Sequence, residues 1–242
     1  MRCALVTGAS GGIGGAICDM LADKGFSLAL AYNKNEQAAA SLIAKYQKNG
    51  TNCIAVSADL SRDDGADRLA DGLKGFSCVD TLINCAGVAS FGQICDVTEE
   101  EIRRVMNVNF YSPLRLIRRL SQSMTQQGFG RIVNISSMWS LVGSSCESVY
   151  SASKAALEGL SKSLAKELGR SGITVNCVAP GLIDTEMNRE IDRAAISEIV
   201  DNTPLNRMGT PSDVAKSVAL LVDEDCFITG ETLNVSGGFV II

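Results

Sequence analysis

The chain has 242 residues, an apolar fraction of 46%, a charged fraction of 20% and a formal net charge of −5. These values are typical of one large folded domain and exclude a disordered or fibrous chain. The negative charge argues against nucleic acid as the main partner, and no apolar run approaches the roughly 20 residues needed to span a membrane. Because a strand-like run begins at Cys3, we expect no leader segment and a cytoplasmic protein.

The chain contains no histidine. This absence excludes a Ser-His-Asp triad, a histidine general base and a histidine-ligated metal. The nine cysteines form no C-x-x-C pair, so we expect no metal site and no disulfide framework. Reduced thiols pack as small hydrophobes. Cys146 differs from the others because it lies between Ser137 and Tyr150.

Strand-like and helical segments alternate along the chain. The first strand, at residues 3–7, runs into a glycine-rich loop at 8–15, and an apolar helical pattern follows it as far as Gly25. Further strands are expected at residues 26–32, 53–58, 79–84, 131–136, 173–178 and 232–235. Further helices are expected at residues 35–48, 62–74, 99–126, 150–168, 185–201 and 211–222, with a break in the long helix near Pro113.

This alternation predicts an α/β fold: a single-domain, Rossmann-type doubly wound sheet of about seven parallel strands with helices on both faces. The domain would span residues 1–242, with a mobile substrate-loop insert at about 183–208. In such sheets, ligands bind at the carboxyl ends of the strands. Glycine and polar residues follow several of these strands, at positions 8, 59, 84–87, 136–137 and 180–181. We therefore expect them to meet in one crevice.

The glycine-rich loop is a candidate phosphate site. Glycines let the backbone approach an anion, and the N-terminus of the following helix presents free N–H groups to it. The spacing Gly8-x3-Gly12-x-Gly14 differs from the G-x-G-x-x-G pattern of dinucleotide-binding folds. On this stretch alone, a loop without a binding role is the alternative.

Tyr150 and Lys154 are four residues apart on an expected helix, so their side chains leave the same face. A phenol can donate the proton that a ketone needs on reduction, and a nearby ammonium group should lower its pKa from about 10. The hydroxyl of Ser137 could stabilise the developing oxyanion. The simpler alternatives are a helix-surface pair and a serine that caps a loop.

Seven features of the chain together resemble the short-chain dehydrogenase/reductase family, and the resemblance covers nearly the whole sequence. They are Thr7-Gly8-x3-Gly12-x-Gly14, Asp59-Leu60, Asn84-x-Ala86-Gly87, Asn109, Ser137, Tyr150-x3-Lys154 and Pro180-Gly181. The resemblance implies an NAD(P)-dependent oxidoreductase acting on CH–OH and C=O groups. The implied catalytic residues are Asn109, Ser137, Tyr150 and Lys154.

The resemblance also implies a cofactor site. In this implied site, Lys154 would hold the nicotinamide ribose, and Asn109 would hold a water molecule that links Lys154 to solvent. Asn109 could instead bond the backbone at a helix bend, and Asp59 could cap the helix after it. The implied cofactor-binding residues are Gly8, Ser10, Gly11, Gly12, Ile13, Gly14, Asn33, Lys34, Asp59, Leu60, Asn84, Ala86, Gly87, Tyr150, Lys154, Pro180, Gly181, Ile183 and Thr185.

The end of the second strand bears on the choice of cofactor. Folds that prefer NAD usually carry an acidic residue there, which bonds the ribose hydroxyls. Residues 31–34 contain none, so NADP(H) is favoured, with Asn33 and Lys34 near the 2′-phosphate. NAD(H) stays possible, because members specific for NADP often have a basic residue where this chain has Gly11 and Gly15.

Within the family, residues 180–187, 207–209 and 233–238 are most similar to 3-oxoacyl-[acyl-carrier-protein] reductases. This implies NADPH-dependent reduction of a 3-oxoacyl thioester in fatty acid biosynthesis, by a homotetramer. The implied substrate-binding residues are Ser137, Trp139, Tyr150 and Met187. Acidic acyl carrier protein would dock on basic residues near the start of the fifth strand and the end of the catalytic helix.

That docking patch is weakened here. Gln126 and Gln127 stand at the first place, although Arg131 follows, and Arg170 stands at the second. A weaker basic patch lowers the rate of encounter with an acidic partner. The alternative is therefore an enzyme for a free alcohol or ketone, a steroid, a sugar or a CoA ester. A non-catalytic dinucleotide-binding sensor is a third hypothesis, which the complete set of Ser137, Tyr150 and Lys154 disfavours.

Overall fold

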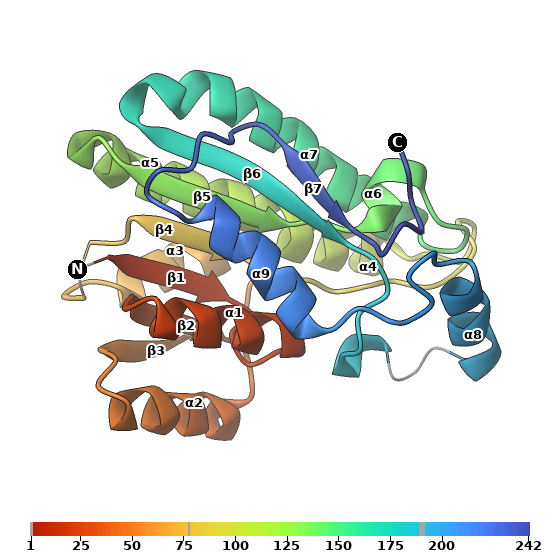
Figure 1. The fold of residues 1–242 in the computed structure, drawn as a ribbon, viewed down its shortest axis with the longest axis horizontal. Coiled ribbons are helices and arrows are strands. Elements are labelled where there is room, and N and C mark those ends of the chain that lie inside the picture. Colours follow the sequence, from red (N-terminus) through yellow and green to blue (C-terminus); the bar gives the residue numbers. More distant parts are fainter. Residues whose placement is uncertain (1, 77, 189–191) are drawn as a thin grey trace.

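A seven-stranded parallel sheet in the order β3-β2-β1-β4-β5-β6-β7 forms the centre of the computed structural model (Figure 1). The structure describes residues 2–76, 78–188 and 192–242. The strands are β1 Cys3–Thr7, β2 Ser27–Tyr32, β3 Cys53–Ser57, β4 Thr81–Asn84, β5 Gly130–Ile135, β6 Ile173–Pro180 and β7 Thr232–Val235. The strand order reverses between β1 and β4, so the predicted doubly wound sheet is confirmed.

Helices cover both faces of the sheet (Figure 1). The α-helices are α1 Gly12–Asp23, α2 Glu36–Lys48, α3 Gly65–Gly72, α4 Glu99–Met106, α5 Ser112–Gln127, α6 Met138–Val142, α7 Ser148–Leu168, α8 Arg193–Asp201 and α9 Pro211–Leu221. A π-helical turn, η1 Asn107–Tyr111, joins α4 to α5. Short 3₁₀ turns lie at η2 Gly169–Ser171 and η3 Glu186–Asn188.

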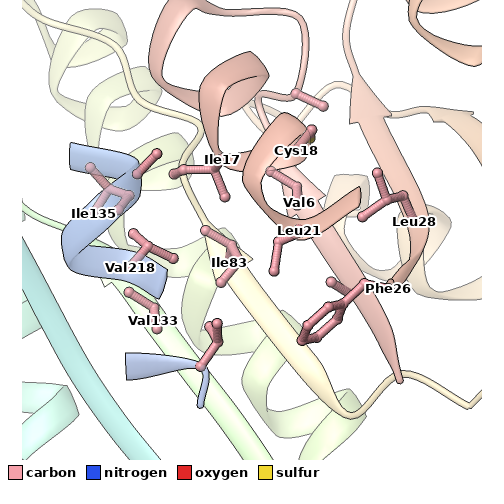
Figure 2. Close-up of a cluster of buried hydrophobic side chains, with 14 of the residues drawn as sticks. Val6, Ile17, Cys18, Leu21, Phe26, Leu28, Ile83, Val133, Ile135 and Val218 are labelled. Carbon is pink, nitrogen blue, oxygen red and sulfur yellow. The ribbon is translucent and has the colours of Figure 1, made fainter. Parts of the chain in front are cut away.

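The strands are apolar at nearly every position because side chains alternate between two buried faces. In β1, Ala4 and Val6 contact one apolar cluster, whereas Cys3 and Leu5 contact the other. The first cluster includes side chains of α1, α2 and α9, and Figure 2 shows Ile17 and Val218 of this cluster pointing toward the strands. The second cluster includes side chains of α3, α5 and α7. The sheet is thus the rigid middle layer that fixes the loops at its carboxyl edge.

The helices differ from the sequence-based expectations at several places. The break in the long helix is the π-turn at Asn107–Tyr111 and not Pro113, which lies in the first turn of α5, where its missing N–H costs nothing. The short helix α6 was not expected. Helix α3 begins at Gly65, three residues later than predicted, because a turn at Asp59 and Ser61 precedes it.

The predicted segment 185–201 is split into η3 and α8, and residues 189–191 between them lie outside the described part of the chain. The mobility of the 183–208 insert stays a prediction. All nine cysteines are free thiols; Cys3, Cys18, Cys53 and Cys177 are buried, whereas Cys146 is exposed and has a positive φ of 62°. In the described residues, no helix has the length and apolarity that crossing a membrane would require.

Candidate active site

The candidate site lies where the strand order reverses, at the carboxyl ends of β1 and β4. The loop after β1 contacts the segment after β4. A Cβ atom on Gly8 would lie 2.9 Å from the Cα of Ala86, and Gly8 has a φ of +67°. The hydroxyl of Thr7 accepts hydrogen bonds from the backbone N–H groups of Cys85 and Ala86, each at 3.0 Å. Two predicted cofactor segments are therefore joined at one point.

The first turn of α1 is suited to a phosphate group. No side chain caps it at Gly11, and it carries no acidic residue. Gly14 packs against the loop so closely that a Cβ atom would lie 2.1 Å from the carbonyl oxygen of Gly8. Ser10 and Gly11 are exposed, so an anion can reach the backbone there. Free N–H groups and the helix dipole favour negative charge at this position.

Asn84, at the end of β4, carries an unmatched polar atom. Its Nδ2 donates to Oδ1 of Asn134 at 2.8 Å, but its own Oδ1 is buried and has no hydrogen-bond partner in the described structure. A buried acceptor without a partner is costly. Together with the uncapped helix, this free acceptor shows that the residues present fit a ligand with donor groups and phosphates, such as a dinucleotide.

Tyr150 and Lys154 lie on one face of α7, as predicted from their spacing. The Lys154 side chain is buried, its Nζ donates to the carbonyl oxygen of Ile135 at 2.8 Å, and it lies 5.8 Å from the centre of the Tyr150 ring. Burial lowers the pKa of Lys154 to about 8, because a low-dielectric interior disfavours the charged form.

The pKa of Tyr150 moves in the direction opposite to our expectation. Burial raises it to about 12; a hydrogen bond with Ser137 opposes this increase, and the charge of Glu147 adds to it. The decrease predicted from Lys154 does not appear in this structure, because burial is the largest influence on the pKa of Tyr150 and Lys154 is not among its causes. A phenol of raised pKa is protonated at neutral pH, which is the form that can donate a proton.

Ser137 lies two residues after the end of β5 and is the N-cap of α6, where its Oγ accepts a hydrogen bond from the N–H of Trp139 at 3.2 Å. The expected capping serine and the expected site serine are thus the same residue. Its carbonyl oxygen is held by the hydroxyl of Ser140, which also contacts the buried carboxylate of Glu158. Ser136 donates to the same carboxylate oxygen at 2.7 Å. This network fixes the turn that carries Ser137.

Asn109 lies in the π-turn and is fully buried. Its Oδ1 accepts from the N–H of Val88 at 2.9 Å, and its Nδ2 donates to the carbonyl of Val88 and to Ser153, each at 3.0 Å. The side chain of Asn109 thus forms hydrogen bonds with the backbone at a helix bend. This is the alternative that we gave to a catalytic role for Asn109. A Cβ atom on Gly87 would lie 3.3 Å from Nζ of Lys154 and 3.6 Å from Oδ1 of Asn109, so the three residues meet.

A pocket of about 250 Å³ opens beside Tyr150. It brings together residues from the loops after β1, β4, β5 and β6. The predicted site residues that line it are Ile13, Gly87, Ser137, Trp139, Tyr150, Lys154, Pro180, Gly181, Ile183, Thr185 and Met187. Trp139 packs edge-on against Phe239 at 5.6 Å between ring centres, whereas Met187 is half exposed at 51%. The pocket is thus lined by both polar and apolar side chains.

The remaining predicted cofactor residues lie outside this pocket, farther along the carboxyl edge of the sheet. Asn33 and Lys34 are exposed after β2, and the carbonyl of Asn33 accepts from Ser57 at 3.1 Å. Asp59 accepts from the N–H of Ser61 at 3.0 Å, so it closes a turn and does not cap α3. The pKa of Asp59 is lowered by the Ser61 hydroxyl and, more weakly, by Lys34. Leu60 is buried and its carbonyl accepts from Ser112 at 2.9 Å.

Sequence reasoning missed two carboxylates in this region. Glu147 lines the pocket, three residues before Tyr150, and Glu158 lies one turn beyond Lys154 on the same face of α7. The second could have been found, because positions 150, 154 and 158 are polar on a helix face that should otherwise be buried. Glu147 lies before the part of α7 in which apolar residues recur with helical spacing, so no pattern in the sequence identifies it.

Comparisons with known proteins agree with this arrangement. A family model described as enoyl-(acyl carrier protein) reductase matches residues 8–240. The chain is 41% identical to an uncharacterized oxidoreductase, YmfI, of Bacillus subtilis (strain 168), over 98% of both chains. It is 36% identical to a 3-oxoacyl-[acyl-carrier-protein] reductase of a Synechocystis species, over 98% of this chain and 96% of the relative.

Two solved structures match nearly the whole fold. One is a blue fluorescent protein from a metagenomic library in complex with NADPH, with a TM-score of 0.93 and 35% identity over 99% of this chain and 98% of the other. The second is a putative NAD(P)-dependent gluconate 5-dehydrogenase from Beutenbergia cavernae with bound NADP, with a TM-score of 0.93 and 32% identity over 98% of this chain and 96% of the other. The fold, the glycine loop and the match over almost the full length all lead to one conclusion: this chain belongs to the short-chain dehydrogenase/reductase family of oxidoreductases.

Proposed function

We propose that the protein reduces the ketone of a 3-oxoacyl thioester to the 3-hydroxyacyl form with NADPH. The observation that carries this proposal is the pocket in which Ser137, Tyr150 and Lys154 meet beside the glycine loop. The relatives named as 3-oxoacyl-[acyl-carrier-protein] reductases support the substrate class. The solved relatives that contain NADPH or NADP support the cofactor.

The geometry of the pocket supports the following roles. When bound, the nicotinamide supplies the hydride. Tyr150, protonated at neutral pH because burial raises its pKa to about 12, donates a proton to the oxygen that becomes the alcohol. Ser137 donates a hydrogen bond to the same oxygen. Lys154 places a positive charge beneath the tyrosine and holds the ribose hydroxyls, and Asn109 holds Gly87 and the π-turn in place around it.

Binding of the dinucleotide is assigned to the edge of the sheet. The uncapped N-terminus of α1 and the backbone of Gly11 and Gly12 hold the phosphates, and Asn84 offers its free acceptor. Asp59 and Leu60 flank the base. Pro180, Gly181, Ile183 and Thr185 close the nicotinamide side. Asn33 and Lys34 hold the 2′-phosphate, since an exposed cation and an amide at the end of β2 suit an anion.

The substrate assignment is tested with thioesters and ketones of matched size. We expect acetoacetyl-N-acetylcysteamine with NADPH to give a value of kcat/KM at least tenfold above those of simple ketones, sugars and steroids, because its amide and thioester occupy the pocket mouth. Initial rates from the loss of NADPH absorbance give the comparison. No thioester reduction beside good rates on another ketone would show that the substrate class is a free ketone.

Acyl carrier protein is a weaker candidate as a partner. Arg131, expected in its docking patch, is 4% exposed and donates to the carbonyl oxygens of Gly130, Gly172, Asp223 and Glu224. It therefore serves the fold and is not available to a partner. Arg170 is exposed at the other place. Of the two arginines expected in the patch, only Arg170 is accessible, which supports weak docking, so the proposed substrate is the thioester itself, with the carrier protein as one bearer of it.

The cofactor preference is tested at Lys34. The variant Lys34→Ala should raise the KM for NADPH by about tenfold and leave the KM for NADH unchanged, because a charge-assisted bond to a phosphate is lost. Lys48→Ala, which removes an exposed lysine from the far end of α2, is the matched control. Equal effects on both cofactors would remove Lys34 from the 2′-phosphate site.

We also propose self-association into a homotetramer. Strand β7 is an edge of the sheet, and edge strands left open invite pairing. Apolar side chains near this edge are exposed: Phe227 is 103% exposed, Ile241 85% and Ile242 86%. Apolar groups gathered at an open sheet edge are typical of contact surfaces between subunits.

A further inference from the structure

Glu147 gives the pocket a negative charge beside the proposed proton donor. It occupies the N-cap position of α7, one turn before Tyr150, and it lines the pocket together with Ser144. Its side chain is partly buried. Its Oε2 accepts a hydrogen bond from the hydroxyl of Ser144 at 3.1 Å, which orients the carboxylate. In the described residues, Oε1 has no protein partner, so it is free to meet a substrate.

The other ionisable groups in the pocket do not neutralise this charge. Among the described residues, the lining includes one basic residue, Lys154, which is buried and lies seven residues, or about two helical turns, beyond Glu147. Cys85 also lines the pocket, but burial raises the pKa of its thiol to about 12, so it is uncharged at neutral pH. The charge of Glu147 acts on Tyr150, whose pKa it helps to raise. An anionic group beside Glu147 would therefore meet repulsion, because the cation of the lining lies about two helical turns away.

We propose that Glu147 is a specificity-determining residue, which excludes substrates bearing a carboxylate or phosphate next to the carbonyl and accepts neutral ones. The inference rests on the proposed function and narrows its substrate class. A thioester of a pantetheine-like arm is neutral and carries amide N–H groups beyond the sulfur, so it suits a carboxylate at the mouth. A sugar acid carries a negative charge and does not.

A pair of ligands with the same 3-oxo group tests this inference: neutral ethyl acetoacetate and anionic acetoacetate. The wild-type enzyme should favour the ester in kcat/KM. The variant Glu147→Gln keeps an acceptor for Ser144 and removes the charge, so the ratio of ester to anion should fall at least about tenfold. Glu167→Gln, an exposed position near the far end of α7, is the matched control and should keep the wild-type ratio.

Two further measurements separate this idea from a structural role. Binding of both ligands to the NADPH complex, measured by calorimetry, should show the same change in ratio and does not depend on turnover. In the oxidation direction, Glu147→Gln should move the rising limb of the pH profile to lower pH, because loss of the negative charge lowers the pKa of Tyr150. A merely structural role would not move that limb.

The outcomes distinguish this inference from the proposed function. An unchanged ester-to-anion ratio in Glu147→Gln, in both kinetics and binding, would overturn the role of Glu147 even if thioesters are good substrates. If the wild type binds the ester in preference to the anion, Glu147→Gln loses that preference and neither protein reduces a thioester, the role of Glu147 is supported and the proposed substrate class is rejected.

Discussion

Replacement of Tyr150 by phenylalanine should lower the rate of ketone reduction by about 10³-fold, which is within the range attributed to general acid catalysis. Phenylalanine keeps the ring and its packing but removes the proton that the oxygen needs and the hydrogen bond with Ser137. Initial rates with saturating NADPH measure the loss. Binding of NADPH, followed by its fluorescence, should stay close to that of the wild type, because the loops that hold the phosphates are distant from the ring.

Tyr111→Phe provides the control for this variant. Tyr111 is 41% exposed at the end of the π-turn, so its hydroxyl should contribute little, and full activity is expected. Turnover that persists in Tyr150→Phe would show that another group delivers the proton, and the proposed mechanism would then be abandoned.

Replacement of Gly14 by alanine should cost about 3 kcal/mol of stability, typical of a severe overpacking change. A Cβ atom there would lie 2.1 Å from the carbonyl oxygen of Gly8 and 2.8 Å from its carbonyl carbon. These are backbone atoms, so no rotamer change can relieve the contact, and the loop must move away from the helix. Chemical denaturation gives the loss of stability, and the Kd for NADPH should rise at least tenfold because the loop is the proposed phosphate site.

Gly15→Ala is the matched control, one residue along the same helix. There the nearest atom to a new Cβ, the carbonyl oxygen of Ala9, is 3.8 Å away, which is an ordinary contact. Alanine is favoured over glycine inside a helix by about 1 kcal/mol, so this variant should be slightly more stable. A Gly14→Ala variant as stable as the wild type would mean that the loop is not packed as the structure shows.

The sheet is predictable from the sequence because its strands are buried on both faces and read as continuous apolar runs. The strands expected at residues 3–7 and 232–235 coincide with β1 and β7. The crevice is predictable for a related reason, since polar residues that follow parallel strands must meet at one edge. The expectation that Ser137 and Tyr150 share one site agrees with the pocket that both residues line.

The short elements and the electrostatics are not predictable in this way. Helix α6 has five residues, which is too few for an apolar period to appear. Proline predicts a break, but Pro113 is tolerated in a first turn, and the bend falls at the π-turn instead. Whether the pKa of Tyr150 rises or falls depends on how the effect of burial compares with the effects of nearby charges. A spacing of four residues between Tyr150 and Lys154 gives no information about burial. Burial also misleads the sequence-based prediction for Arg131. An arginine is expected to be exposed and available to a partner, but Arg131 is buried.

The reversal of strand order between β1 and β4 separates the proposed phosphate-binding segments, in the first part of the chain, from most of the pocket lining, in the second. The proposed dinucleotide segments after β1, β2 and β3 precede residue 84, whereas the pocket lining is drawn from residue 85 onward, apart from Ile13. Changes in the loop after β5 can therefore alter the pocket without disturbing the phosphate loop, whereas Thr185, after β6, lies beside Gly12. Descendants of such a chain can keep the same dinucleotide cofactor while they diverge toward new substrates. This agrees with relatives that are named as 3-oxoacyl-[acyl-carrier-protein] reductases and as gluconate dehydrogenases.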